Sequence, residues 1–216
     1  MAFINYTTNN LLIKIVYYGP GLSGKTTNLR YIYYKIDPAS RGAIISLETE
    51  AERTYFFDLL PIKAGYIGYF KVNFQLMTVP GQVYYEASRK NVLLGTDGIV
   101  FVADSQIPLL DANLESFEGL RRNFQDQKLD LNLVPLVFQY NKRDLDNLIP
   151  VETLNNLLNP QRLPYIEASA ISGHGVFETL KEIARLTIPR VREKIFGEKD
   201  EDALSSSSIK DDIELI

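Results

Sequence analysis

The chain has 216 residues, a formal net charge of −4 and 45% hydrophobic residues, enough for one folded core of ordinary size. It contains no cysteine, which excludes disulfide scaffolds, thiolate zinc sites and thiol catalysis. No window approaches the roughly eighteen apolar residues of a membrane span, and the N-terminus has no secretory pattern. We therefore expect no transmembrane segment and a cytoplasmic location.

Charge is unevenly distributed along the chain. Residues 197–216 carry two lysines and seven acidic residues, a net charge of −5, so residues 1–196 are nearly neutral. A neutral body argues against the broad basic surface of a nucleic-acid-binding protein. The acidic segment has too little apolar surface to offset the entropic cost of ordering it. The sequence thus predicts one folded domain over residues 1–196 and a disordered acidic tail over residues 197–216.

The first expected strand, residues 12–18, leads directly into a phosphate-binding pattern. The segment Gly19-Pro20-Gly21-Leu22-Ser23-Gly24-Lys25-Thr26 matches GxxxxGK[ST] and opens an expected helix over residues 25–36. Glycines allow backbone N–H groups to approach phosphate oxygens, and the positive end of the helix faces the same oxygens. We expect Lys25 to bind the outer phosphates, Thr26 to bind Mg²⁺, and Thr27 to border the nucleotide.

The segment between this helix and the next expected strand, residues 70–79, is unusually aromatic. Tyr55, Phe56 and Phe57 stand among charged residues, where a loop that contacts partners or switches with the ligand is expected. Burial preferences favour core packing of these rings just as well. On its residues alone, Arg53 is most simply a surface cation paired with a nearby glutamate.

Strands and helices then alternate to the end of the domain. The expected strands cover residues 98–103, 134–140 and 164–168, and the expected helices cover residues 110–127, 151–159 and 176–196. Pro189 is expected to kink or end the last helix. This alternation predicts an α/β fold, a three-layer sandwich with a mostly parallel central sheet, whose ligands bind at the carboxyl ends of the strands.

A second nucleotide-binding pattern follows the strand over residues 134–140, where Asn141-Lys142-Arg143-Asp144 matches NKxD. The Asp144 carboxylate can accept hydrogen bonds from the ring N–H and exocyclic amine of guanine, a donor pair that adenine lacks. Asn141 can brace the loop, and the stem of Lys142 can cover the purine face. Ser169-Ala170-Ile171 can offer a backbone N–H to the guanine carbonyl oxygen. The two patterns together predict GTP or GDP as the ligand.

Three functions are compatible with a phosphate-binding pattern at this position. A P-loop kinase or ATPase would share residues 19–26 but has no use for NKxD. A nucleotide-bound scaffold with little or no hydrolysis would keep both patterns and lack catalytic groups. A GTP-hydrolysing switch needs both patterns, a positioned water and a group that neutralises charge on the transferred phosphoryl.

Over residues 11–190 the chain resembles the Ras-like small GTPases, and more narrowly the MglA family of bacterial polarity GTPases. The resemblance rests on Phe3-Ile4-Asn5-Tyr6, Lys14-Ile15-Val16-Tyr17-Tyr18-Gly19-Pro20-Gly21-Leu22, Thr78-Val79-Pro80-Gly81-Gln82-Val83, Phe101-Val102-Ala103-Asp104-Ser105-Gln106 and Gln139-Tyr140-Asn141-Lys142-Arg143-Asp144. It implies a P-loop small GTPase fold, GTP/GDP and Mg²⁺ as cofactors, and a switch that sets cell polarity or directs motility. It also implies a Roadblock-type GTPase-activating partner of the MglB kind, polarity or motility effectors, and recruitment to a cell pole by partners. We expect the chain alone to be a monomer.

The same resemblance assigns the catalytic groups. Gln82 matches the glutamine that orients the attacking water, and Gly81 can approach the γ-phosphate through its N–H. Arg53 is implied to act as an arginine finger supplied by the chain itself. Thr54 is implied to be the switch threonine that completes Mg²⁺ coordination.

One position departs from the general small-GTPase pattern. The usual DxxG element supplies an aspartate near Mg²⁺, whereas Thr78 occupies that position here. A hydroxyl can orient a water but carries no negative charge. We therefore expect weaker retention of Mg²⁺ in the absence of nucleotide phosphates, or a substitute carboxylate such as Asp58.

Overall fold

A computed structural model describes residues 2–49, 53–80 and 86–197, and for residues 47–49, 53–56 and 86 only the backbone is described. The strands are β1 (Phe3–Asn5), β2 (Asn10–Tyr18), β3 (Ile45–Thr49), β4 (Arg53–Ile67), β5 (Phe70–Thr78), β6 (Gly98–Asp104), β7 (Leu136–Asn141) and β8 (Tyr165–Glu167). The α-helices are α1 (Lys25–Lys35), α2 (Glu86–Leu93), α3 (Leu110–Asp126), α4 (Val151–Leu158) and α5 (Val176–Phe196). Short 3-10 helices cover Pro38–Ser40, Ile107–Leu109 and Leu131–Leu133.

The strands form one eight-stranded sheet in the order β3-β4-β5-β2-β6-β7-β8, with β1 paired to β2. Strands β5, β2, β6, β7 and β8 pair in parallel, whereas β4 is antiparallel to β3 and β5, and β1 is antiparallel to β2. The expected α/β fold with a mostly parallel central sheet is confirmed. Because the central strands are parallel, the loops after β2, β6 and β7 emerge at the same end of the sheet.

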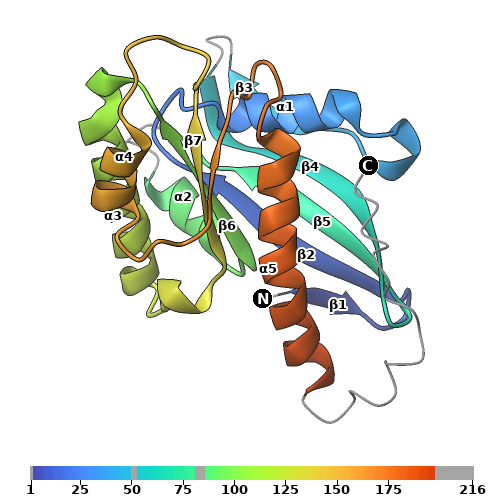
Figure 1. The fold of residues 1–216 in the computed structure, drawn as a ribbon. Coiled ribbons are helices and arrows are strands. Elements are labelled where there is room, and N and C mark those ends of the chain that lie inside the picture. The colour runs from blue at the N-terminus through green and yellow to red at the C-terminus, as the bar shows by residue number, and fades with distance from the viewer. Residues whose placement is uncertain (1, 50–52, 81–85, 198–216) are drawn as a thin grey trace.

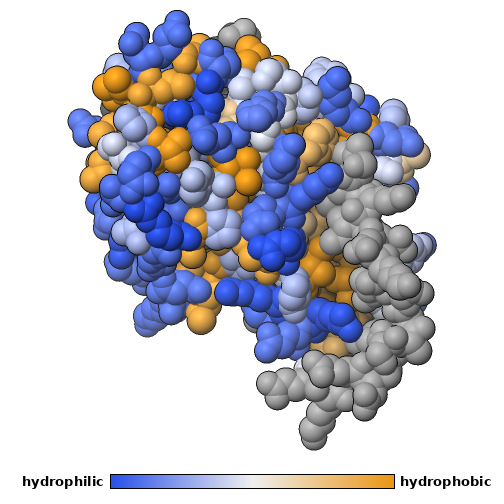
Figure 2. Space-filling model, in the orientation of Figure 1, coloured by the Kyte–Doolittle hydropathy of each residue, from blue (hydrophilic) through white to orange (hydrophobic). Residues whose placement is uncertain are grey.

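Helices flank the sheet because its central strands bury side chains on both faces. On β2, Ile13 and Ile15 pack in a cluster that includes residues of α1 and α5, while Val16 and Tyr18 pack with residues of α2, α3 and α4. Figure 1 shows α5 crossing the sheet, with α3 and α4 grouped beside β6 and β7. The outer side of α5 is mainly hydrophilic, as Figure 2 shows, which agrees with its buried apolar stripe facing the sheet.

The hairpin β3–β4 differs from the switch loop that we expect from the sequence over residues 53–60, around Tyr55, Phe56 and Phe57. Leu60 and Ile62 alternate with less buried neighbours and face the core, which is the two-residue period of a strand covered on one face. Phe57 is partly buried against the core, so this ring serves packing. The side chains of residues 55 and 56 lie outside the description. Strand β1 and helix α2 were also not expected.

Helix α5 continues through Pro189 to Phe196, so the expectation that the helix could end at this proline is wrong. The residues beyond it keep contact with the core, because Val191 is buried and Ile195 and Phe196 pack against the same cluster as the rest of the helix. These contacts offset the backbone hydrogen bond that proline cannot donate. None of the described helices combines the length and apolar character needed to cross a bilayer.

Candidate guanine nucleotide site

The phosphate-binding loop joins β2 to α1 in a conformation that depends on glycine at two positions. Gly19 and Gly24 have φ of +145° and +98°. A Cβ on Gly19 would collide with the carbonyl oxygen of Val102, and one on Gly24 would collide with the side-chain amide of Asn141. The loop is therefore tightly held against β6 and β7 by its backbone. Leu22, between the glycines, has φ of +60° and an exposed side chain.

Lys25 is a buried cation at the start of α1. Its Nζ donates to the carbonyl oxygens of Gly19 at 2.9 Å and Pro20 at 2.6 Å. Burial, assisted by the positive charge of Arg89, lowers the pKa of the Lys25 ammonium to about 7, against the opposing effect of Asp58. An anion beside this amine would offset the cost of burying its charge, and a phosphate group meets that requirement.

Asp58 gathers three hydroxyl groups at the other side of the loop. Its Oδ2 accepts from Thr26 Oγ1 at 2.6 Å and from Thr78 Oγ1 at 2.8 Å, and its Oδ1 accepts from Ser46 Oγ at 2.7 Å. The Asp58 backbone N–H donates to Thr78 Oγ1 at 2.8 Å. Asp58 is fully buried. A carboxylate thus lies in contact with the predicted Mg²⁺ ligand Thr26, and Thr78 binds this carboxylate.

Asn141 joins the phosphate-binding loop to two later loops. Its Nδ2 donates to the carbonyl oxygen of Ser23 at 2.7 Å, and its Oδ1 accepts from the backbone N–H of Ala170 at 2.8 Å. Ser23 and Ala170 are both buried. The structure therefore brings together three segments that lie far apart in the sequence, as their expected roles require.

Lys142 is held by a carboxylate that the sequence reasoning did not single out. Its Nζ lies 2.6 Å from Asp104 Oδ2, and Asp104 is only 1% exposed. The backbone N–H of Gln106 donates to Asp104 Oδ1 at 3.0 Å, which fixes the carboxylate further. Asp104 ends β6, at the same end of the sheet as the NKxD segment, and this position in the sequence could have marked it as a candidate site residue. Asp144 is exposed and accepts no hydrogen bond from the described residues.

The segment 169–171 has buried and exposed members. Ser169 and Ala170 are buried, whereas Ile171 is 78% exposed. The hydroxyls of Ser169 and of Ser23 are buried without a hydrogen-bond partner in the described part of the chain. Unpaired buried hydroxyls in two nucleotide loops, with the buried amine of Lys25, fit a polar ligand at this place. The chemistry of the site therefore agrees with a bound guanine nucleotide.

The expected catalytic residues are less completely described. Gly81 and Gln82 lie outside the described residues, and so do residues 198–216 of the acidic tail. Arg53 and Thr54 are the first residues of β4, and their backbones pair with Thr49 and Glu48 of β3. Their side chains lie outside the described part of the chain, so the catalytic role of Arg53 stays a prediction. Thr27 is exposed on the first turn of α1.

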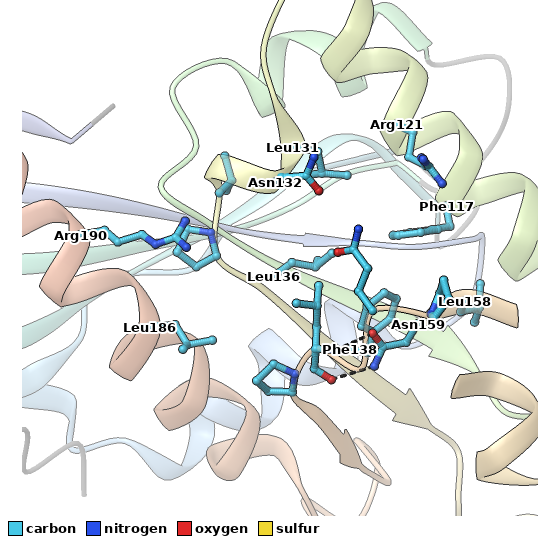
Figure 3. A pocket seen from close by; sticks show the side chains of 16 residues that line it. Phe117, Arg121, Leu131, Asn132, Leu136, Phe138, Leu158, Asn159, Leu186 and Arg190 are labelled. Atoms are coloured by element: carbon cyan, nitrogen blue, oxygen red, sulfur yellow. Dashed lines mark hydrogen bonds between the residues drawn. The ribbon is translucent and has the colours of Figure 1, made fainter. Parts of the chain in front are cut away.

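A separate cavity of about 240 Å³ lies away from these loops, along the first half of β7 (Figure 3). Leu136, Phe138 and Leu158 line its apolar part, and Arg121 of α3 and Arg190 of α5 border it. The nucleotide loops follow the opposite end of β7. This cavity therefore does not belong to the candidate nucleotide site.

Comparison with known proteins identifies the family. No protein-family model matches the chain. The chain is 54% identical over 192 residues to the mutual gliding-motility protein MglA of Myxococcus xanthus (strain DK1622), covering 89% of this chain and 98% of that protein. The chain belongs to the MglA family of small GTPases. Membership agrees with the resemblance inferred from its motifs, and a small GTPase of this family implies guanine nucleotide binding.

Nucleotide binding is expected to take up a proton at pH 8. In the nucleotide-free protein Lys25 is mostly neutral at this pH, because its pKa is about 7. Bound phosphates favour the charged amine, so GDP binding should take up close to one proton. Below pH 7 the amine already holds its proton, and this uptake declines. Calorimetry at pH 8 in two buffers of different ionisation enthalpy measures it.

The control is Lys63→Met, because the exposed Lys63 amine bonds the carbonyl oxygen of Ala39 and no other group of the described residues. This variant should show the same proton uptake as the unmodified protein. A binding enthalpy at pH 8 that does not depend on the buffer would contradict the account of Lys25.

Proposed function

We propose that this chain is a molecular switch that binds GTP, hydrolyses it slowly and changes partners with its nucleotide state. The observation that carries the proposal is the convergence of three loops on Asn141, which bonds both Ser23 and Ala170. The family assignment supports the same activity. We infer for the whole domain the three-layer arrangement of P-loop small GTPases, with the nucleotide at the carboxyl ends of β2 and β7.

In this proposal each loop binds one part of the nucleotide. Backbone N–H groups of the phosphate-binding loop and the Lys25 amine bind the phosphates. The Asp144 carboxylate accepts the guanine N–H groups, and the Lys142 stem, held at its end by Asp104, covers the purine face. A backbone N–H of segment 169–171 donates to the guanine carbonyl oxygen. Adenine would leave the Asp144 carboxylate without donors.

We infer that Asp58 supplies the negative charge that Thr78 cannot. Mg²⁺ would be held by the hydroxyls of Thr26 and Thr54 together with phosphate oxygens, and it would neutralise charge on the phosphates. Asp58 is bonded directly to the Thr26 hydroxyl, so its carboxylate is placed to orient that ligand. Thr78 then has the accessory role of fixing Asp58, because its Oγ1 donates to the carboxylate and accepts from the Asp58 N–H.

Hydrolysis in this proposal depends on Gln82 and Arg53. Gln82 orients the attacking water, Gly81 donates its N–H to the γ-phosphate, and Arg53 neutralises charge on the transferred phosphoryl. Arg53 and Thr54 begin a strand here, paired with β3. We propose that partner binding rearranges this end of β4, places Arg53 at the γ-phosphate and so accelerates a slow basal reaction.

The cellular role is inferred from the relative. The name of the M. xanthus protein states a role in gliding motility, and we propose a related role in motility or polarity for this chain. The expected partners are a Roadblock-type activating protein and polarity effectors, with the chain monomeric and cytoplasmic until partners recruit it to a pole. We propose that residues 1–196 suffice for nucleotide binding and that the acidic tail is dispensable for it.

The Asp58→Asn variant is expected to need at least about tenfold more Mg²⁺ to retain bound GDP, because the amide keeps the shape but loses the charge. The measurement is release of a fluorescent GDP analogue across a Mg²⁺ titration. Asp111→Asn, an exposed carboxylate at the start of α3, is the matched control and should behave as the unmodified protein. An unchanged Mg²⁺ midpoint in Asp58→Asn would remove Asp58 from the metal site.

Arg53→Ala and Gln82→Ala should each lower partner-stimulated GTP turnover by about 10² or more, because an arginine finger alone is worth roughly 10³ to 10⁵ in rate. The affinity for GDP should stay within about threefold of the unmodified protein, because GDP lacks the γ-phosphate that these groups serve. Phosphate release with and without a Roadblock-type partner measures the effect.

Arg122→Ala removes an exposed arginine of α3 and is expected to keep full turnover. If both catalytic-site variants kept partner-stimulated turnover, the assignment of Arg53 and Gln82 would be wrong. If the unmodified chain bound GTP and never hydrolysed it, the chain would be a nucleotide-bound scaffold.

A further inference from the structure

Three polar side chains lie fully buried beneath the two nucleotide-binding loops. They are Asn28 on α1, Gln139 on β7 and Thr179 on α5, each 0% exposed. The two amides bond each other reciprocally: Asn28 Nδ2 donates to Gln139 Oε1 at 2.8 Å, and Gln139 Nε2 donates to Asn28 Oδ1 at 3.0 Å. Gln139 Nε2 also donates to Thr179 Oγ1 at 2.9 Å. We call these three residues the buried amide network.

The buried amide network reaches the backbone of two loops. Asn28 Nδ2 donates to the carbonyl oxygen of Gly24 in the phosphate-binding loop at 2.9 Å. Thr179 Oγ1 donates to the carbonyl oxygen of Gly175, the residue that precedes α5 and lies four positions after Ile171, at 2.6 Å. Gln139 itself lies two positions before Asn141. The network therefore connects α1, β7 and α5, the elements that adjoin the three loops, whereas Asn141 connects the loops directly.

All polar atoms of the network are satisfied. Each amide donates two hydrogen bonds and its oxygen accepts one, and the threonine hydroxyl both donates and accepts. Burying three polar side chains costs free energy unless every bond is made, so a single altered member is costly. A fully satisfied network is rigid and fixes the relative position of its members more strictly than apolar packing does.

We propose that Asn28 and Gln139 are positioning residues that hold the phosphate-binding loop at a fixed distance from the base-binding loop. A guanine nucleotide spans this distance from its phosphates to its base. When the distance between the two loops is fixed, binding of the phosphates keeps the base in its loop, and binding of the base keeps the phosphates in theirs. The consequence is slow nucleotide release. The inference rests on the proposed function, because it requires that both loops bind one guanine nucleotide.

The deciding variant replaces both amides with apolar side chains of similar size, Asn28→Leu with Gln139→Met. No donor is orphaned, because the Thr179 hydroxyl keeps its bond to Gly175 and the Gly24 carbonyl still accepts the backbone N–H of Asn28 at 3.0 Å. Stability should therefore stay near that of the unmodified protein. Release of a fluorescent GDP analogue should nevertheless be about tenfold faster or more, on the magnitude of two lost hydrogen bonds.

Two further variants separate positioning from stability. The exchange Asn28→Gln with Gln139→Asn restores a reciprocal amide pair and should return GDP release to within about threefold of the unmodified rate. Asn159→Leu removes a buried amide that bonds the Leu163 backbone and does not belong to the buried amide network. It should lower the unfolding temperature without changing GDP release. A release rate that follows the unfolding temperature across all variants would overturn the proposal.

If the double apolar variant does not fold, Thr179→Val provides the test. It removes one bond to Gln139 and leaves the reciprocal pair, and its GDP release should still be faster than that of Asn159→Leu. An equal rate would overturn the proposal. Failure of the proposed function is distinguishable, because the unmodified protein would then not bind GDP, whereas failure of this inference leaves GDP bound, with release rates that are unchanged or that follow the unfolding temperature.

Discussion

The candidate site depends on the two hydrogen bonds made by the Asn141 side chain. Its amide donates to the phosphate-binding loop at Ser23 and accepts from Ala170, so one buried side chain fixes three loops that follow three different strands. Gly24 lies so close to this amide that no larger residue fits there. The parallel sheet brings the loops to one end of the molecule, and Asn141 sets how they face one another there.

Charge at the site is arranged around one buried cation and one buried carboxylate. Lys25 has carbonyl oxygens as its hydrogen-bond partners, which leaves its positive charge for an anionic ligand. Asp58 instead collects hydroxyl groups, including that of Thr26. Asp58 on the neighbouring strand β4 thus carries the negative charge that position 78 lacks, and its carboxylate contacts the hydroxyl of Thr78. The hairpin β3–β4 consequently contributes to the site as well as to the sheet.

Much of the fold could be predicted from the sequence, because the central strands and the helices after them have the apolar patterns of an α/β sheet. The phosphate-binding and NKxD patterns could be placed for the same reason, since each is a continuous segment after an apolar run. The β4 hairpin was missed because its aromatic and charged residues also suit an exposed loop. No local pattern reveals the contact between Asn28 and Gln139, which lie 111 residues apart.

Local sequence also could not establish which polar residues support the site. Asp104 ends a buried strand and could have been a structural residue, and only the fold places it 2.6 Å from the Lys142 amine. Asp58 was anticipated as a substitute carboxylate, and its bond to Thr26 depends on the antiparallel pairing of β4 with β5. The roles of Gln82 and Arg53 remain predictions that rest on family resemblance.

The most direct test of a site shared by a phosphate-binding loop and a guanine-binding loop is calorimetric titration of nucleotide-free protein with GDP and with ADP in the presence of Mg²⁺. Our account predicts that GDP binds at least about 10³-fold more tightly than ADP, because adenine leaves the Asp144 carboxylate without its two donors. Equal affinities for the two nucleotides, or no binding of either, would contradict it.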